Sequence, residues 1–390
     1  MRLVLVAQDF PPTRGGIQSY CFELARNWAL ACERFVVLAP EVSGARNFDA
    51  DAPFDVHRLR ATQNSFFIAA ALALGRLGRS WVSFHSHWYS AGPALALRRG
   101  RATGPVFVAA HGRELLHEPW HRVRSAQAVY DRARRFALSR ATCVFAVSQF
   151  TSELVSRSSR GRALVEVHPN GTDPTRFRPG ARVELRRARG LELGASIFLC
   201  VARLVARKGI DTTLRAFQAV LAVNPEAQLL IVGEGPERAP CETLASTLGL
   251  GSRVRFLGAL NQDELVCCYQ LADVFVLPAR SEGSDVEGFG IAYLEASACG
   301  LPCIGPNVGG PCDAIVHEQT GICVDPTSVA AVSDAMKRLA ADPEARSRMG
   351  DRGRQRVLSE LNWPGVAARI FRSIQLHSVR SQPATRPDPA

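Results

Sequence analysis

Short apolar runs rich in branched residues alternate with helix-length segments along nearly the whole chain. The runs in the first half are LVLVAQ, RFVVLAP, DVHRL, WVSFHS, VFVAAH, CVFAVS and ALVEVHP, and those in the second half are SIFLCVA, AQLLIVG, RVRFLG, VFVLP and LPCIG. Continuous apolar strands separated by helices form parallel sheets that are covered by helices on both faces. Two arrays of this kind in series therefore predict an α/β protein with two doubly wound, Rossmann-like domains.

A segment rich in proline, arginine and glycine separates the two arrays near residues 172–195. We therefore expect an N-terminal domain over residues 1–180 and a C-terminal domain over residues 190–362, each able to bury its own core. The polar, proline-rich residues 377–390 have the composition of a disordered tail. Ligands of open parallel sheets bind outside the carboxyl ends of the strands, so we expect the two domains to face each other across a cleft.

Residues 280–300, RSEGSDVEGFGIAYLEASACG, carry two glutamates eight positions apart, Glu287 and Glu295. These glutamates flank a glycine-rich loop that precedes an apolar helix expected over residues 291–298. The loop consists of Gly288, Phe289 and Gly290. A glycine loop at a helix N-terminus exposes backbone N–H groups to an anion, whereas carboxylates suit hydroxyl groups such as those of sugars. Phosphate and sugar hydroxyls in one site indicate a nucleotide sugar.

The spacing E-x7-E within EGFGIAYLEA resembles the signature of family 4 retaining glycosyltransferases of the GT-B fold. The later segment GLPCIGPNVGGPCDAIVHEQTGICVDP resembles that family's pattern too, and the resemblance extends from Met1 to about Ile374. It implies a C-terminal helix over residues 363–376 that crosses back onto the first domain. It also implies transfer of a hexosyl group from a nucleotide diphosphate sugar, bound by the C-terminal domain, to an acceptor bound by the N-terminal domain.

Two cations, Arg203 and Lys208, follow a strand of the second domain in CVARLVARKGID, where Lys208 is expected to begin the next helix. Cations at the mouth of a parallel sheet suit a diphosphate leaving group, which gains negative charge as the glycosidic bond breaks. The family uses an arginine and a lysine in this R-x4-K spacing for that purpose. We interpret the intervening Arg207 as a surface residue.

The resemblance assigns roles to the other residues of the second domain. Glu295 is expected to bond the ribose hydroxyls and Glu287 the hydroxyls of the transferred sugar. Gly235, in GEGP, is expected beside the nucleotide, and Phe256, in VRFLG, near the base. No carboxylate is placed as a covalent nucleophile. We therefore expect front-face substitution, in which the leaving phosphate takes the acceptor's proton.

Candidate residues of the first domain also follow strands. Gly15 and Gly16 stand between the first strand and a helix, where glycine lets a phosphate or sugar approach the backbone closely. This is not the G-x-G-x-x-G pattern, which argues against NAD. His111 ends VFVAAH, and the family often places a histidine here, near the donor sugar and the leaving phosphate. His85 and His87 end another strand, where they are either acceptor-site residues or an ordinary, partly exposed pair.

The sequence Asp285-Val286-Glu287 is similar to the D-x-D motif that holds a divalent metal in another glycosyltransferase fold. We reject that interpretation because Arg203, Lys208 and the glycine-rich helix start supply positive charge without a metal. The eleven cysteines contain no C-x-x-C pair, and we expect them to be reduced thiols of a cytosolic protein. The sequence therefore predicts transfer that needs no metal and no cofactor.

The net charge of +11 arises in the first half: residues 1–180 hold 24 Lys and Arg against 13 Asp and Glu, whereas residues 181–390 hold 23 of each. Six arginines cluster in residues 121–140. They form either a surface for anionic lipid head groups or a phosphorylated acceptor, or a solvated helix face. No nucleic-acid-binding motif accompanies them. No apolar run reaches the roughly 18 residues of a membrane span, so any membrane attachment would be peripheral, at the inner face.

The motifs are compatible with more than one donor and more than one acceptor. EGFGIAYLEA is similar to mannosyltransferases that act on phosphatidylinositol-type lipids, which favours GDP-mannose over a UDP-sugar and a lipid-linked or glycan acceptor. Three alternatives are a sugar-nucleotide epimerase or hydrolase of the same fold, a sucrose- or trehalose-type synthase with a soluble acceptor, and a binding protein that has lost catalysis.

Overall fold

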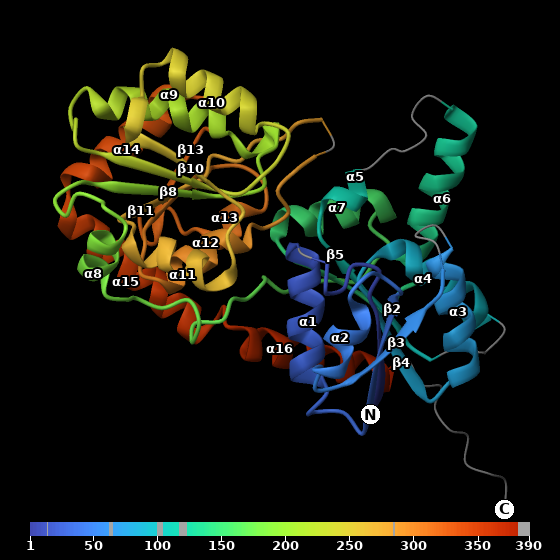
Figure 1. Ribbon diagram of the computed structural model, residues 1–390. Helices are drawn as coiled ribbons and strands as arrows, with labels where there is room; N and C mark the ends of the chain where they lie inside the picture. Colours follow the sequence, from blue (N-terminus) through green and yellow to red (C-terminus); the bar gives the residue numbers. More distant parts are fainter. Residues whose placement is uncertain (14, 62–64, 100–103, 117–122, 284, 381–390) are drawn as a thin grey trace, which may run out of the picture. The chain divides into compact units, whose positions relative to one another are not determined.

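The computed structural model describes residues 1–13, 15–61, 65–99, 104–116, 123–283 and 285–380. The chain forms two compact units (Figure 1). The first unit contains residues 1–170 and the chain from Trp363 onwards, and the second contains Gly171–Asn362. The expected tail begins inside the last helix, which ends at Arg380, and the rest of that tail lies outside the described residues.

The first unit is built on seven parallel strands in the order β3-β2-β1-β4-β5-β6-β7. All seven expected runs form strands: β1 (Arg2–Val6), β2 (Arg34–Pro40), β3 (Asp55–Leu59), β4 (Trp81–His85), β5 (Val106–Ala110), β6 (Cys143–Ala146) and β7 (Val165–Val167). The helices are α1 (Gly16–Trp28), α2 (Ala45–Ala50), α3 (Phe66–Leu77), α4 (Trp88–Arg99), α5 (Arg113–Leu116), α6 (Arg124–Arg140), α7 (Gln149–Ser159) and α16 (Trp363–Arg380).

The second unit repeats this architecture with six parallel strands in the order β10-β9-β8-β11-β12-β13. The strands are β8 (Ile197–Val201), β9 (Gln228–Val232), β10 (Val254–Gly258), β11 (Val274–Val276), β12 (Cys303–Pro306) and β13 (Gly321–Val324). The last of these was not expected from the sequence, because GICV is short and follows a turn rather than a helix. The strand order, three outward from the centre and then three in the other direction, is that of a Rossmann domain.

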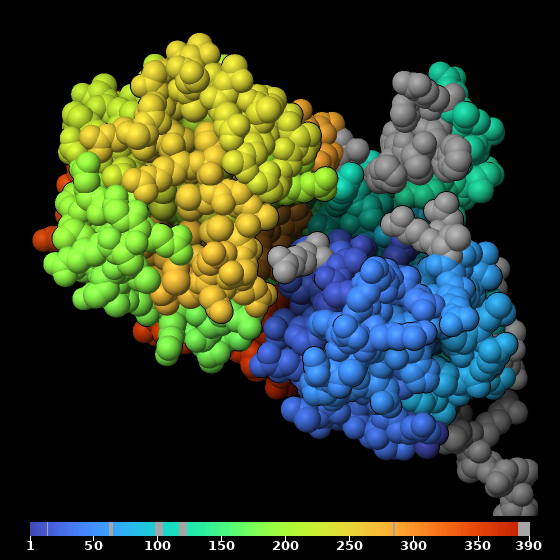
Figure 2. Space-filling view, in the orientation of Figure 1, coloured from blue at the N-terminus to red at the C-terminus, as the bar shows by residue number. Residues whose placement is uncertain are grey.

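Helices cover both faces of the second sheet, with α9, α10 and α14 on one side and α11, α12 and α15 on the other (Figure 1). Their bounds are α8 (Arg182–Ala188), α9 (Ile210–Leu221), α10 (Arg238–Thr247), α11 (Gln262–Leu271), α12 (Ile291–Ala298), α13 (Pro311–Ala314), α14 (Val329–Ala341) and α15 (Pro343–Ser359). In the space-filling view the second unit presents a continuous surface in green, yellow and gold (Figure 2). The strands can be apolar throughout because neither face of the sheet meets water.

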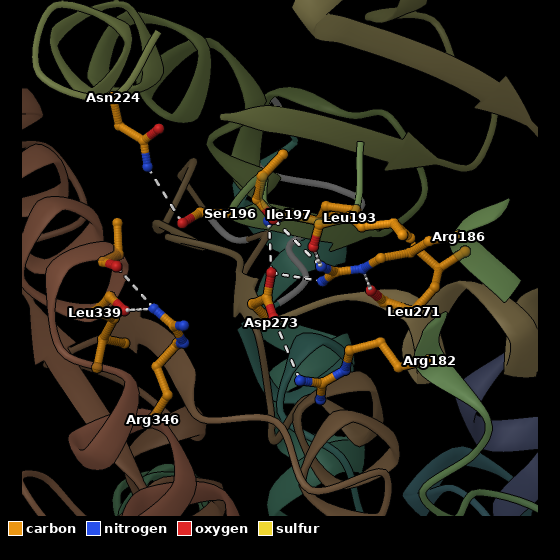
Figure 3. A network of polar contacts seen from close by, with 12 residues as sticks. Arg182, Arg186, Leu193, Ser196, Ile197, Asn224, Leu271, Asp273, Leu339 and Arg346 are labelled. Carbon is orange, nitrogen blue, oxygen red and sulfur yellow. Dashed lines mark hydrogen bonds and ion pairs between the residues drawn. The ribbon is translucent and has the colours of Figure 1, made fainter. Parts of the chain in front are cut away.

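Helix α8 lies within the segment expected as a linker, and a buried ion pair holds it to the second unit (Figure 3). Nη2 of Arg186 lies 2.6 Å from Oδ2 of Asp273, which also accepts a hydrogen bond of 2.8 Å from the backbone N–H of Ile197. Arg182 binds the other oxygen of Asp273 at 3.3 Å. Since removing one partner of a buried pair costs about 3–5 kcal/mol, this contact fixes α8 against the start of β8.

The last helix, α16, completes the core of the first unit although it follows the whole second unit in sequence. The indole N–H of Trp28 donates to the backbone carbonyl of Ala367 at 2.9 Å, across 339 positions of chain. Trp363 packs edge-to-face on Tyr20, and Trp28 packs against Phe371. In the described residues, no helix is long and apolar enough to span a bilayer.

Candidate active site

The loop after β8 carries the two predicted cations. It runs from Arg203 through a short 3-10 helix, Ala206–Lys208, so that Lys208 precedes α9 rather than beginning it. Gly209 follows with a φ of +65°, and a Cβ at this position would lie 2.2 Å from the carbonyl oxygen of Pro278. Only glycine fits both constraints. It therefore fixes the cationic loop against the chain that leaves β11 toward Glu287.

A second glycine-dependent contact joins this loop to the loop after β9. A Cβ on Gly233 would lie 1.9 Å from the carbonyl oxygen of Ala202, and one on Gly235 would lie 2.2 Å from that of Leu204. The backbone N–H of Leu204 donates to the carbonyl of Glu234 at 2.9 Å. The structure thus gives Gly235 a definite role in loop packing. Its expected place beside a nucleotide stays a prediction.

Lys208 and Arg207 converge on the carboxylate of Glu287. The ammonium of Lys208 and Nη1 of Arg207 both bind Oε2 of Glu287, and Nε of Arg207 lies 3.1 Å from Oδ1 of Asp285. The interpretation of Arg207 as a surface residue is therefore wrong, since its side chain is only 19% exposed and contacts both acids. Arg203 is exposed, and its expected contact with the diphosphate stays a prediction.

The charges of the cluster are mutually dependent. Burial by itself would raise the pKa of Glu287, but the ammonium of Lys208 and the guanidinium of Arg207 outweigh burial and hold that pKa below its ordinary value. Glu287 is therefore ionised at neutral pH. Lys208 and Arg207 therefore offer N–H donors that can turn from the carboxylates to an incoming anion.

The glycine loop beside Glu287 begins α12 as expected. Gly290 caps the helix with a φ of +91°, and Phe289 is buried. A Cβ on Gly310 would lie 1.8 Å from the carbonyl oxygen of Gly288, and the N–H of Gly310 donates to the carbonyl of Glu287 at 3.2 Å. The pair Gly309-Gly310 was not predicted as part of the site, although it stands in the quoted segment. It holds the loop in place.

Glu295 lies on α12 in a different environment from Glu287. The hydroxyl of Tyr269 donates to its Oε2 at 2.8 Å. Burial raises the pKa of Glu295, against the opposing effects of the Tyr269 hydrogen bond and the charge of Arg176. The two glutamates of the E-x7-E motif therefore differ in partners: one faces cations and the other a phenol.

Phe256 lies on β10, the edge strand of the second sheet, and is half-buried. The register between β10 and β9 shifts between Phe256 and Gly258, where φ is +70°. The structure thus places Phe256 at the sheet edge near the loop of Glu234. Its expected contact with a base stays a prediction.

His111 follows β5 in the first unit and is held by its neighbours. Oε1 of Glu114 accepts from the backbone N–H of His111 at 2.6 Å and from that of Gly112 at 3.3 Å. The ring packs edge-to-face on Tyr20 at 5.0 Å. Burial lowers the pKa of His111 to about 4, against a hydrogen bond with the backbone of Ser86, so the ring is neutral at pH 7. Its buried Nε2 accepts or donates no hydrogen bond within the described residues.

His85 and His87 are both buried, so neither is the partly exposed residue considered from the sequence. His85 hydrogen-bonds to Ser90 at 3.0 Å and Ser83 at 3.2 Å, which makes it a satisfied core residue. His87 lies closer to the predicted site. Its ring centroid is 5.6 Å from that of His111, and it stacks on Tyr89 at 4.8 Å.

Asp9 was missed from the sequence, because a single acid after a strand has no pattern. Its Oδ2 lies 3.5 Å from Nε2 of His87, and burial raises its pKa. The predicted Gly15 and Gly16 lie at the start of α1, in the same unit, where Gly15 has an extended backbone that any residue can adopt. A Cβ on Gly15 would meet only the end of the flexible Gln18 side chain, so the backbone of this unit does not require glycine there.

Comparison with known proteins agrees with this architecture. Residues 15–171 match the family model "Glycosyl transferase 4-like domain" and residues 182–356 match "Glycosyl transferases group 1". A "GDP-mannose-dependent alpha-(1-6)-phosphatidylinositol monomannoside mannosyltransferase" of Mycobacterium tuberculosis is 35% identical over 95% of this chain and 97% of its own. The enzyme of the same description from Mycolicibacterium smegmatis is 32% identical over 94% of this chain and 97% of its own.

Solved structures show the same fold. Sucrose-phosphate synthase from Thermosynechococcus elongatus superposes with a TM-score of 0.78 at 25% identity, covering 97% of this chain and all of that one. Anabaena HepE in complex with UDP superposes with a TM-score of 0.81 at 16% identity, covering 96% of this chain and all of that one.

Two Rossmann-like domains with these neighbours define the GT-B class, as predicted. The chain belongs to the family 4 glycosyltransferases, and the prediction of a glycosyltransferase is confirmed.

Proposed function

We propose that this enzyme transfers a mannosyl group from GDP-mannose to a phosphatidylinositol-type lipid acceptor, with retention of configuration and without a metal. The observation that carries the donor assignment is the convergence of Lys208 and Arg207 on Glu287 beside the glycine loop that begins α12. Cations and helix N–H groups suit a diphosphate, and the adjoining carboxylate suits sugar hydroxyls. The two mycobacterial relatives are GDP-mannose-dependent enzymes that act on a phosphatidylinositol mannoside, which supports GDP-mannose and the lipid class.

In the proposed reaction, the donor diphosphate takes over the cations that bind Glu287, which releases this carboxylate to the hydroxyls of the mannosyl group. The bond between the anomeric carbon and the diphosphate oxygen breaks as the acceptor hydroxyl bonds to the same face of that carbon. The hydroxyl proton passes to the departing phosphate oxygen. Lys208, Arg207 and Arg203 stabilise the charge that grows there.

His111 would take a different part, because its ring is neutral. A neutral imidazole can hydrogen-bond to a sugar hydroxyl through Nε2 without adding charge to the site. Glu295 would bind the ribose hydroxyls. Together these roles need no carboxylate nucleophile, which supports front-face substitution.

The proposal of metal-independent transfer is supported by the contacts of Asp285. In the D-x-D interpretation this carboxylate would bind a divalent ion, yet it lies against the guanidinium of Arg207. The test is transfer measured in excess EDTA, at a temperature well below unfolding. Activity that is abolished there and restored by manganese would refute the proposal.

The donor is tested by thermal shift with GDP-mannose, UDP-glucose and UDP-N-acetylglucosamine at equal concentrations. Binding to the folded state stabilises by RT ln(1 + [L]/Kd), so a ligand at about 100 times its Kd contributes about 2.7 kcal/mol. GDP-mannose is expected to raise Tm most. A larger shift with a UDP-sugar would overturn the donor assignment, and transfer to a soluble sugar phosphate would favour the synthase alternative.

Only some of the arginines of residues 121–140 can form the expected surface for anionic lipid. The arginines expected to form it are those at 122, 124, 132, 134 and 135. Arg122 lies outside the described residues, Arg124 and Arg132 are exposed on α6, and Arg135 is half-buried. Arg134 does not belong to such a face, because it binds the carbonyl of Leu115 and the carboxylate of Asp131. We propose that Arg124 and Arg132 attract the anionic inner face of the membrane, with the enzyme attached peripherally on the cytoplasmic side.

A further inference from the structure

Three residues with metal-binding side chains meet where α16 packs on the edge of the first sheet. Cys143 is the first residue of β6, Glu166 lies on β7, and His377 lies in the last turn of α16. One ligand atom from each lies within 4.8 Å of the other two, and this is the only such group among the described residues. Cys143 and His111 stand at opposite ends of their strands, so the group is separate from the candidate active site.

Glu166 is the centre of the group. Its Oε1 lies 2.6 Å from Nε2 of His377, and its Oε2 lies 3.1 Å from Nε2 of His168. Both imidazole rings therefore already point at the carboxylate. Cys143 is fully buried, His168 and His377 are 12% exposed, and Glu166 is 32% exposed, so an ion could reach the group past Glu166.

We propose that Cys143, Glu166 and His377 bind a Zn²⁺ ion whose fourth ligand is water, with His168 orienting the carboxylate through its second oxygen. Thiolate, imidazole and carboxylate are the ligands that zinc takes in proteins. A thiolate and a carboxylate together would neutralise the charge of the ion. A ligating carboxylate that is itself hydrogen-bonded to a histidine is the outer-shell arrangement that usually supports such sites.

The geometry requires little movement. Ligand atoms around a tetrahedral zinc ion with bonds of about 2.0–2.3 Å are roughly 3.3–3.7 Å apart. The Glu166–His377 contact must open by about 1 Å, and the other separations, which are at most 4.8 Å, must close by up to about 1 Å. The thiol proton of Cys143 must leave on binding, which is the main cost, because burial raises the pKa of this thiol.

The consequence would be a cross-link between residues that are far apart in the sequence. Cys143 and His377 come from a strand in the middle of the chain and from its last helix. Zinc would therefore fasten α16 to β6 and β7. Without zinc, the contact between Glu166 and His377 joins β7 to α16 at this place, in addition to the packing of Trp363 and Phe371 elsewhere on the helix.

The full chain, freed of metal by dialysis against a chelator, is titrated with Zn²⁺ in competition with a chromophoric chelator. We expect one high-affinity ion per chain and a higher Tm with zinc. Titration with Co²⁺ reports on the ligands, because a thiolate bound to cobalt gives a charge-transfer band in the near ultraviolet.

Cys143→Ser and His377→Gln should each weaken zinc binding at least tenfold, and Cys143→Ser should abolish the cobalt band. His377→Gln keeps a hydrogen-bond donor to Glu166, so it separates zinc binding from the ion-pair network. Cys268→Ser, at a buried thiol of the second unit, is the matched control and should bind zinc like the wild type.

The proposal is overturned if the wild type binds no zinc, or if both variants bind it as tightly as the wild type does. Unchanged near-ultraviolet circular dichroism verifies that each variant is folded. If the wild type binds no zinc, the group is only a hydrogen-bonded cluster. If both variants bind zinc like the wild type, the ion binds elsewhere.

Discussion

The two units have the same central strand order, but the side chains at the carboxyl ends of their strands differ in charge. In the second unit the cations Arg207 and Lys208 both contact the ionised carboxylate of Glu287. In the first unit the strands β4 and β5 are followed by His87 and His111, whose pKa values burial lowers, so that both are neutral at pH 7. Strand order thus determines where a ligand can bind, and the residues after each strand determine which charge it can carry.

This difference matches the two parts of a glycosyl transfer. A diphosphate needs cations that are already desolvated and oriented, since these act on charge as it develops. An acceptor hydroxyl can be bound by neutral groups such as an imidazole, which hydrogen-bond to it without adding charge. Substitutions of the charged residues and of the neutral histidines therefore test this contrast.

Lys208→Gln should lower kcat by about 10²–10³, because one preorganised donor to the leaving group is lost, which costs about 3–4 kcal/mol of transition-state stabilisation. Steady-state kinetics with the donor checks this. Lys337→Gln changes the other lysine of the chain, on α14, and should leave kcat within twofold. If kcat of Lys208→Gln falls less than threefold, the diphosphate does not leave beside Lys208.

Substitutions of the two glutamates should affect nucleotide binding and turnover differently. Glu295→Ala removes hydrogen bonds to the ribose, which product and substrate share, so affinity for the bare nucleoside diphosphate should fall about ten- to a hundredfold. Glu287→Gln should leave that affinity within threefold and mainly lower kcat, because its proposed contact with the donor is to the transferred sugar, which the bare nucleoside diphosphate lacks. Calorimetric titration of the nucleoside diphosphate into both variants measures these affinities. An equal loss of affinity in both would contradict the roles assigned to the two glutamates.

Acid should destabilise the first unit through its neutral histidines. The folded-state pKa of His111 is about 4 against an ordinary 6.5, so the unfolded chain takes up a proton first as the pH falls below 6.5. Stability should therefore fall from pH 6.5 toward pH 4, at up to about 1.4 kcal/mol per pH unit for this group. His111→Gln should lose about 2 kcal/mol less than the wild type between pH 7 and 5.

Urea unfolding followed by tryptophan fluorescence measures this in the first unit alone, since all five tryptophans of the chain belong to it. The raised pKa values of Asp9 and Glu114 act in the opposite sense, which is why the variant is compared with the wild type. His57→Gln, at an exposed histidine, is the control. Identical pH profiles in wild type and His111→Gln would contradict the prediction.

The exposed arginines of α6 should have the smallest effect. Arg124→Gln and Arg132→Gln should each weaken sedimentation with anionic vesicles about fivefold, since a cation near such a surface contributes about 1 kcal/mol. High salt should weaken binding of the wild type as well. Arg348→Gln, in the second unit, is matched in charge and should change nothing. If the wild type stays in the supernatant at low salt, α6 is a solvated face.

The sequence predicts the strands well because apolar runs of this kind need burial on both faces. It predicts β13 poorly, since four residues after a turn form a strand only when β12 pairs with them. Residues of the candidate active site are likewise predictable only where a local pattern marks them. Glu287, Glu295 and Lys208 stand in recognisable spacings, whereas the contacts of Arg207 depend on how the loop after β8 meets the chain after β11.

Long-range packing also explains the other misses. Arg186 stands in a segment whose composition is typical of a linker, and only its pairing with Asp273, 87 positions later, fixes that segment to the second unit. The requirement for glycine at position 310 arises from a carbonyl oxygen 22 positions earlier in the chain, that of Gly288. Neither contact leaves a local pattern.

The position of α16 has a consequence for synthesis. Trp28 is translated early, yet the carbonyl that binds its indole belongs to Ala367, 339 residues later. At about 5–20 residues per second, the ribosome needs roughly 20–70 s to cover that distance. The first unit to emerge is thus the last to be completed, and until then the apolar surface around Trp28 is open to chaperones or to aggregation.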